Sequence, residues 1–163
     1  MWALDWLTRW MRTLPRWEGP LGDKHALVVG IRCTGKTTLI NALAPDGKWV
    51  NSLTEYDLEQ PGRLCIDLAL HKQSAFEALM IARHAGVSCV VETQSLRQLS
   101  PAARAQFPLV FAFSPEPVLE QLTGLSKQEL ERAFCQCGEY ECLVWESGQP
   151  LCKYSVLRKN LLF

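Results

Sequence analysis

The 163 residues suffice for one domain that buries a single core, and a composition that is 48% apolar and 21% charged is typical of soluble proteins. Seventeen basic residues balance seventeen acidic ones, so no overall charge attracts the chain to nucleic acid or membranes. The seven cysteines follow no secretory leader, which predicts free thiols in a reducing compartment rather than a disulfide framework. No apolar run approaches the roughly 18 residues that a transmembrane helix needs.

Residues 1–22 are predicted to form a tryptophan-rich amphipathic helix and a linker, ahead of a main domain at 23–163. The tryptophans recur at helical spacing, as Trp2, Trp6 and Trp10. Arginines make the remainder of this helix basic. Two interpretations are open. The helix packs on its own domain, or residues 2–17 contact a membrane or a partner, since tryptophan suits half-wet surfaces.

Strands and helices then alternate along the chain. Short apolar runs predict strands at 25–30, 48–53, 62–70, 87–94 and 108–114. Helical spacing predicts helices at 36–44, 72–86 and 127–137, the last preceded by the capping-box pair Ser126 and Glu129. This alternation is typical of an α/β sandwich of three layers around a mostly parallel central sheet.

The chain closes with two strand-like segments, 139–147 and 151–157, which are separated by the turn sequence GQP. A glycine and a proline between two alternating runs favour a hairpin. We therefore predict that an antiparallel hairpin ends the sheet.

The segment GIRCTGKT matches the phosphate-loop pattern G-x-x-x-x-G-K-[ST] at every position, between a predicted strand and a predicted helix. Its glycines allow successive backbone amides to turn toward phosphate oxygens, and the helix adds the positive end of its dipole. Lys36 is predicted to reach the β- and γ-phosphates of a nucleotide, and Thr37 to place its hydroxyl on Mg²⁺. The predicted binding residues are Gly30, Ile31, Arg32, Cys33, Thr34, Gly35, Lys36, Thr37 and Thr38.

Two carboxylates are candidates for the chemistry of the site. Asp67, near the end of an apolar run, suits a second Mg²⁺ ligand, although it could instead cap the next loop. Many ATPases place a water-orienting glutamate directly after this aspartate, where this chain has Leu68. Glu92 shares a strand face with Gln94 and lies about 7 Å behind it. Glu92 is predicted to orient the attacking water or to pair with a basic neighbour, and Gln94 to sense the γ-phosphate.

Three segments in this order, ALVVGIRCTGKTTLINAL, RLCID and ALMIARHAGVSCVVETQSLRQLSPAARAQFPLVFAF, resemble the genome-packaging ATPases of poxviruses and related large DNA viruses and virophages. These ATPases belong to the FtsK–HerA superfamily of DNA-pumping P-loop motors. In that family an Arg-His pair ends a helix, a strand then ends in Gln, and a proline and an arginine follow in a helical loop. The matching residues here are Arg83, His84, Gln94, Pro101 and Arg104. The resemblance covers roughly residues 25–156.

The resemblance implies a P-loop NTPase fold and a homo-oligomeric ring that hydrolyses ATP with Mg²⁺. The ring would translocate double-stranded DNA into a preformed capsid. Arg104, or in second place Arg97, would be the arginine that stabilises charge on a neighbour's transferring phosphoryl group; for either residue the alternative is an ordinary solvated helix face. The resemblance also implies an intracellular location, in the host cytoplasm or nucleus, or association with the virion.

Two other functions remain open at this level. A small P-loop kinase or NTPase acting on a small molecule or protein would need an arginine-rich lid, and SLRQLSPAARAQ contains only two arginines. A nucleotide-binding scaffold with reduced hydrolysis is suggested by Leu68. A GTPase is disfavoured because no Asn-Lys-x-Asp motif is present.

Four cysteines close in sequence, Cys135, Cys137, Cys142 and Cys152, have two interpretations. They hold a structural zinc ion, or they are free thiols within the fold, which their irregular spacing favours. Cys33 differs from these because it lies inside the phosphate loop. Alkylation of Cys33 is predicted to block nucleotide binding.

Overall fold

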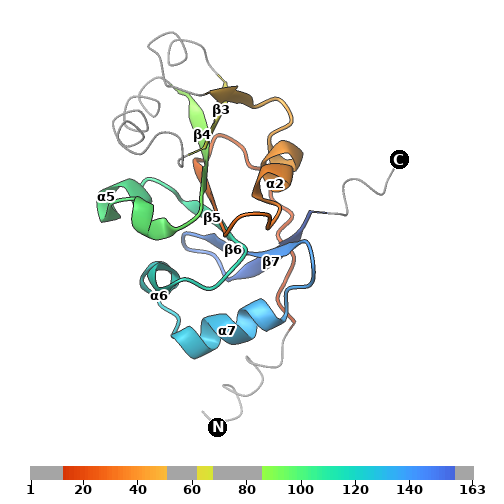
Figure 1. Ribbon diagram of the computed structural model, residues 1–163, viewed down its shortest axis with the longest axis vertical. Coiled ribbons are helices and arrows are strands. Elements are labelled where there is room, and N and C mark those ends of the chain that lie inside the picture. The colour runs from red at the N-terminus through yellow and green to blue at the C-terminus, as the bar shows by residue number, and fades with distance from the viewer. Residues whose placement is uncertain (1–12, 51–61, 68–85, 157–163) are drawn as a thin grey trace.

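The computed structural model describes residues 13–50, 62–67 and 86–156 (Figure 1). The strands are β1 (Ala26–Val29), β2 (Lys48–Val50), β3 (Arg63–Asp67), β4 (Ser88–Thr93), β5 (Leu109–Ala112), β6 (Glu141–Glu146) and β7 (Cys152–Ser155). The helices are α2 (Lys36–Leu43), α5 (Pro101–Arg104), α6 (Pro117–Thr123) and α7 (Lys127–Cys135), with a 3₁₀ turn η1 (Leu96–Gln98). Among these residues, no helix has the length and apolar character that crossing a membrane requires.

The described strands form a single sheet in the order β2-β3-β4-β1-β5-β6-β7. The strands from β2 to β5 in this order pair in parallel, whereas β6 and β7 pair antiparallel. This arrangement confirms the predicted α/β class with a mostly parallel sheet and a C-terminal antiparallel hairpin. Strand β4 lies between β1 and β3, so it separates the strand that leads into the phosphate loop from the strand that ends in Asp67.

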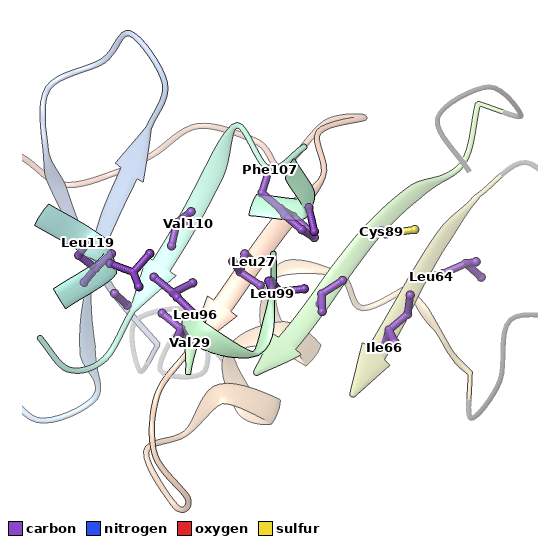
Figure 2. Close-up of a cluster of buried hydrophobic side chains, with 14 of the residues drawn as sticks. Leu27, Val29, Leu64, Ile66, Cys89, Leu96, Leu99, Phe107, Val110 and Leu119 are labelled. Atoms are coloured by element: carbon purple, nitrogen blue, oxygen red, sulfur yellow. The ribbon is translucent and has the colours of Figure 1, made fainter. Parts of the chain in front are cut away.

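Each face of the sheet is covered and has its own core. On one face, α2 packs through Leu39 and Ile40 against Val28 and Phe111. On the other face, η1 and the helices α5 to α7 cover a cluster whose labelled members include Leu27, Leu96, Phe107 and Leu119 (Figure 2). Because successive side chains of a strand point to opposite faces, one strand supplies both cores. The result is the predicted arrangement of three layers.

The segment that precedes β1 pairs with the edge of the sheet. Arg16 bridges Lys153 of β7. The Lys153 N–H donates to the Pro15 carbonyl, and the Trp17 N–H donates to the Lys153 carbonyl, both at 2.9 Å. These bonds satisfy backbone groups that an edge strand would otherwise leave unpaired.

Trp17 and Leu21 belong to the core on the α2 face, with 8% and 4% of their surface exposed. The Trp17 ring packs edge-on against Phe111 and Tyr154. The predicted division of the chain at residue 22 therefore falls inside the packed unit, because Trp17 fills space beneath the sheet. Residues 13–15 are not helical. The remainder of the predicted tryptophan helix lies outside the described residues.

The other predicted elements agree with the structure wherever it describes them. The capping box is present at α7, where the Glu129 N–H donates to Ser126 Oγ and the Ser126 N–H donates to the Glu129 carboxylate. Sequence reasoning missed α6, although Pro117 at its start and Gly124 with φ of 71° after its end are typical helix boundaries. The predicted helix 72–86, apart from its last residue, and the ends of the strands predicted at 48–53 and 62–70 lie outside the described residues.

Candidate nucleotide-binding site

The loop between β1 and α2 has a backbone that requires glycine at two positions. Gly35 has a φ of 92°, in the left-handed region that glycine adopts without strain. At Gly30 the reason is space: a Cβ there would lie 2.7 Å from Thr34 Oγ1 and 3.0 Å from Phe113 Cβ. The loop therefore needs glycine for two different reasons: backbone conformation at Gly35 and space at Gly30.

Helix α2 begins at Lys36 and has no capping side chain, because its N-cap is Gly35. The first N–H groups of a helix have no partner within the helix, and its dipole places positive charge at the same end. The loop and the first turn of α2 thus form an anion site of the kind that holds nucleotide phosphates. The residues present fit a bound polyphosphate.

Asp67 and Glu92 are directly paired in the register of β3 and β4. Their side chains lie on the α2 face, because Cys65 and Val90, two residues earlier on each strand, belong to the core on that face. Glu92 is also paired with Val28 of β1. It therefore lies one strand nearer to the phosphate loop than Asp67 does.

Glu92 contacts the two loop residues that were predicted to bind Mg²⁺ and phosphate. The Thr37 hydroxyl donates to Glu92 Oε2 at 3.0 Å, with Oε1 at 3.3 Å. Lys36 Nζ lies 3.6 Å from Glu92 Oε1 and donates to the Ile31 carbonyl at 2.8 Å. The Lys36 and Glu92 side chains are only 6% and 13% exposed, so water screens their interaction weakly. Of the two sequence interpretations of Glu92, the structure shows the pairing with a basic neighbour.

A cavity of about 420 Å³ opens beside these groups. It is lined by Arg32, Cys33, Lys36, Asp67, Glu92, Thr93 and Gln94. The phosphate loop, both candidate carboxylates and the candidate sensor thus meet in one place. A hydroxyl on Thr37 and carboxylates on Asp67 and Glu92 are the oxygen donors that Mg²⁺ prefers, so the donor set fits this cation.

Thr93, the last residue of β4, lies between the candidates Glu92 and Gln94. No role was predicted for it from the sequence. The Thr93 side chain points to the face opposite α2 and is 1% exposed. Its hydroxyl donates to Gln98 Oε1 at 2.7 Å and lies 2.9 Å from the Ser95 carbonyl. Thr93 therefore ties the end of β4 to the turn η1 and orients the segment that contains Gln94.

No protein-family model matches the sequence, and neither does any curated protein. Solved structures do match. The genome packaging NTPase B204 from Sulfolobus turreted icosahedral virus 2, in complex with ATP-gammaS, aligns with a TM-score of 0.56 at 17% identity, covering 80% of this chain and 96% of that chain. Its complex with sulfate aligns with a TM-score of 0.59 at 19% identity, covering 84% and 97%. B204, the DNA-packaging ATPase from Sulfolobus turreted icosahedral virus, aligns with a TM-score of 0.57 at 18% identity, covering 80% of this chain and 96% of that chain.

The chain has the fold of the genome-packaging NTPase B204. This finding agrees with the family resemblance in the sequence, since these three structures are those of viral genome-packaging NTPases. At 17–19% identity the likeness is one of fold, and the chemistry of the site depends on the residues of this chain.

In this chain, Arg104 lies at the edge of the sheet opposite the phosphate loop. It lines a second cavity together with Asp23, Val87 and Pro108, which precede β1, β4 and β5. The structure therefore does not bring Arg104 together with the other predicted site residues of its own chain. Arg97 differs, because it lies in η1, just beyond the carboxyl end of β4, and is exposed.

The cysteines of this chain do not gather into a metal site among the described residues, where no three His, Cys, Asp or Glu side chains are close enough to hold an ion. Cys142 is fully buried, whereas Cys135 is exposed. Burial raises the pKa of Cys137 to about 11 and that of Cys142 well above its ordinary value. The free-thiol interpretation fits these surroundings better than a zinc site.

Proposed function

We propose that this chain is an ATP-hydrolysing subunit of a motor that moves double-stranded viral DNA into a capsid. The observation that carries the proposal is the meeting of the phosphate loop with Asp67, Glu92 and Gln94 in one cavity. Support for packaging in particular comes from the family resemblance in the sequence and from the fold shared with B204. That protein is a genome-packaging NTPase that forms a complex with ATP-gammaS.

The candidate site residues have roles that suit their chemistry. The loop amides and Lys36 bind and orient the ATP phosphates. Thr37 and Asp67 would hold Mg²⁺, which when bound supplies positive charge against the developing charge of the transition state. Glu92 orients the attacking water and accepts its proton as the oxygen–phosphorus bond forms and the bond to the ADP oxygen breaks. Gln94, at the carboxyl end of β4, contacts the γ-phosphate.

Glu92 supplies from β4 the carboxylate that many ATPases carry directly after the β3 aspartate. Neighbouring strands are about 4.8 Å apart, so a carboxylate paired with Asp67 in register remains close to the same phosphate group. Leu68, the residue at the usual position, lies outside the described residues. The carboxylate on β4 favours a hydrolytic enzyme over a scaffold that only binds nucleotide.

We assign the trans role to Arg104. It lies at the amino edge of the sheet, whereas its own nucleotide cavity lies at the carboxyl edge. Head-to-tail contacts join two different surfaces of identical subunits and can close into a ring. A ring that joins these two edges would present Arg104 to the neighbour's nucleotide. Contact of residues 2–17, apart from the buried Trp17, with a capsid or membrane belongs to the same proposal, as does a location in the infected host cell.

The test is ATP hydrolysis with and without double-stranded DNA, by wild type, Lys36→Ala and the control Lys127→Ala. Lys127 lies on the exposed face of α7, so this control removes the same charge away from the cavity. We expect turnover that DNA stimulates, that Lys36→Ala abolishes and that Lys127→Ala retains. Turnover indifferent to DNA contradicts a motor and favours the smaller kinase or NTPase. Binding without turnover supports the scaffold.

A further inference from the structure

The Glu92 carboxylate already accepts from, or lies beside, the groups with which a phosphate loop binds its ligand. It accepts from the Thr37 hydroxyl at 3.0 Å and lies 3.6 Å from Lys36 Nζ. A polyphosphate entering this cavity would compete with Glu92 for the same ammonium group and the same hydroxyl.

Positive and negative side chains are equal in number in the described lining of the cavity. Its described lining includes the cations Arg32 and Lys36 and the carboxylates Asp67 and Glu92. A polyphosphate adds several negative charges to this set, and the nearest carboxylate to the loop is Glu92. Because Glu92 is 13% exposed, solvent screens the repulsion only in part. A charge within about 4–6 Å shifts a protonation equilibrium by one to three pKa units, or roughly ten- to thousandfold, and a similar effect on anion binding follows.

We propose that Glu92 makes nucleotide binding conditional on a divalent cation. Without the cation, the carboxylate repels the phosphates and retains its contacts with Thr37 and Lys36. With the cation, the same carboxylate faces positive charge and favours the bound nucleotide. The inference rests on the proposed function in one respect, namely that the ligand of the cavity is a nucleotide.

Asp67 carries the same charge as Glu92 and is paired with it in register. We nevertheless expect its replacement to affect nucleotide binding differently. It lies one strand farther from the loop, because β4 separates β3 from β1. Asp67→Asn should weaken nucleotide binding in Mg²⁺ and change metal-free binding little. Glu92→Gln should instead strengthen metal-free binding. The two variants lose the same charge. A different change in metal-free binding would therefore show that the position of the carboxylate decides its effect on nucleotide affinity.

The experiment measures the Kd of a fluorescent, non-hydrolysable ATP analogue in EDTA and in Mg²⁺. It uses wild type, Glu92→Gln, Asp67→Asn and the control Glu139→Gln, whose exposed carboxylate lies before β6 and outside the cavity. We expect wild type and Glu139→Gln to bind at least about tenfold more weakly in EDTA than in Mg²⁺. In Glu92→Gln, metal-free binding should tighten by about tenfold. The ratio of the Kd in EDTA to the Kd in Mg²⁺ should therefore fall toward one.

A wild-type ratio near one, or an unchanged ratio in Glu92→Gln, overturns the inference while leaving nucleotide binding in place. Failure of wild type to bind the analogue even in Mg²⁺ overturns the proposed function as well. Glu92→Ala is the second variant, and melting curves establish that both variants fold. A Mg²⁺ titration of wild type at fixed analogue concentration tests the metal dependence without any substitution. An affinity that stays constant through this titration is again a contradiction.

Discussion

Asp67 and Glu92 are paired in register on the parallel strands β3 and β4, and both side chains lie on the face that α2 covers. This relationship places two carboxylates beside one phosphate loop, although they are 25 positions apart in the chain. It also places Glu92 within hydrogen-bond distance of Thr37. The catalytic part of the proposal depends on this pair.

Replacing Glu92 by Gln should lower the turnover number for ATP by about a hundredfold or more, because general-base catalysis contributes roughly 10²–10⁴. Binding in Mg²⁺ should persist, since the amide can still accept from Thr37. Steady-state phosphate release, with kcat and KM determined separately, measures the effect. Unchanged kcat in this variant would remove Glu92 from the mechanism.

Alkylation of Cys33 should abolish nucleotide binding. Cys33 is exposed and lines the cavity, so an added group fills the space that phosphates need. Burial raises the pKa of Cys89 to about 12, which keeps that thiol protonated and slow to react. Mass spectrometry after brief iodoacetamide treatment should find modification at Cys33 and at the exposed Cys135 first. Cys33→Ser is the control, and its binding should withstand the reagent. Full binding by wild type after complete modification at Cys33 would refute the prediction.

Replacing Trp17 by Ala should destabilise the fold by about 3–5 kcal/mol, the usual cost of removing a large buried aromatic side chain. Trp17 packs against Phe111 and Tyr154 and donates from Nε1 to Glu146 at 3.3 Å. Trp49→Ala is the matched control, because Trp49 is 39% exposed, and it should cost about 1 kcal/mol or less. Urea unfolding measures both. A loss of about 1 kcal/mol or less in Trp17→Ala would contradict the core position of Trp17.

Arg104→Ala should bind ATP normally and lose turnover, because its guanidinium acts on a neighbour's nucleotide in the proposed ring. Mixing this variant with Lys36→Ala should restore part of the activity. Each ring would then contain sites with an intact Lys36 and an Arg104 supplied by the adjacent subunit. Phosphate release from mixtures at several ratios measures this effect. Arg97→Ala mixed with Lys36→Ala is the parallel experiment, and rescue there instead would assign the role to Arg97.

The link between Lys24 and Glu146 should make stability depend on pH in the acid range. The hydrogen bond from Lys24 holds the pKa of Glu146 below its ordinary value of 4.5, with a further contribution from the Trp17 indole N–H. A lowered pKa in the folded state means that the stabilisation is complete above pH 4.5 and is lost as the pH falls through the folded value. Glu146→Gln should therefore be less stable than wild type at pH 7, and the difference should shrink as the pH falls below 4.5. Urea midpoints across this range measure the difference, and a gap that does not change with pH would contradict the assignment.

The sequence by itself determined the phosphate loop, because its requirements are local. Two glycines, a lysine and a threonine within eight residues specify the backbone that holds phosphate, and the structure shows why Gly30 and Gly35 are needed there. The capping box at Ser126 and Glu129 was predictable for the same reason. Short continuous apolar runs likewise predicted most strands, since burial on both faces of a parallel sheet leaves that pattern.

Only the tertiary structure decided which distant residues meet. Thr37 and Glu92 are 55 positions apart, and their hydrogen bond exists because β4 lies between β1 and β3, an order that no local pattern encodes. The same is true of Arg104, which the strand directions place at the edge opposite the phosphate loop. Trp17 looked like part of an outer segment, but it fills the core because Phe111 and Tyr154 leave an aromatic site beside it. Hydrophobic spacing shows that a residue seeks burial, whereas the packing of the whole chain decides where it is buried.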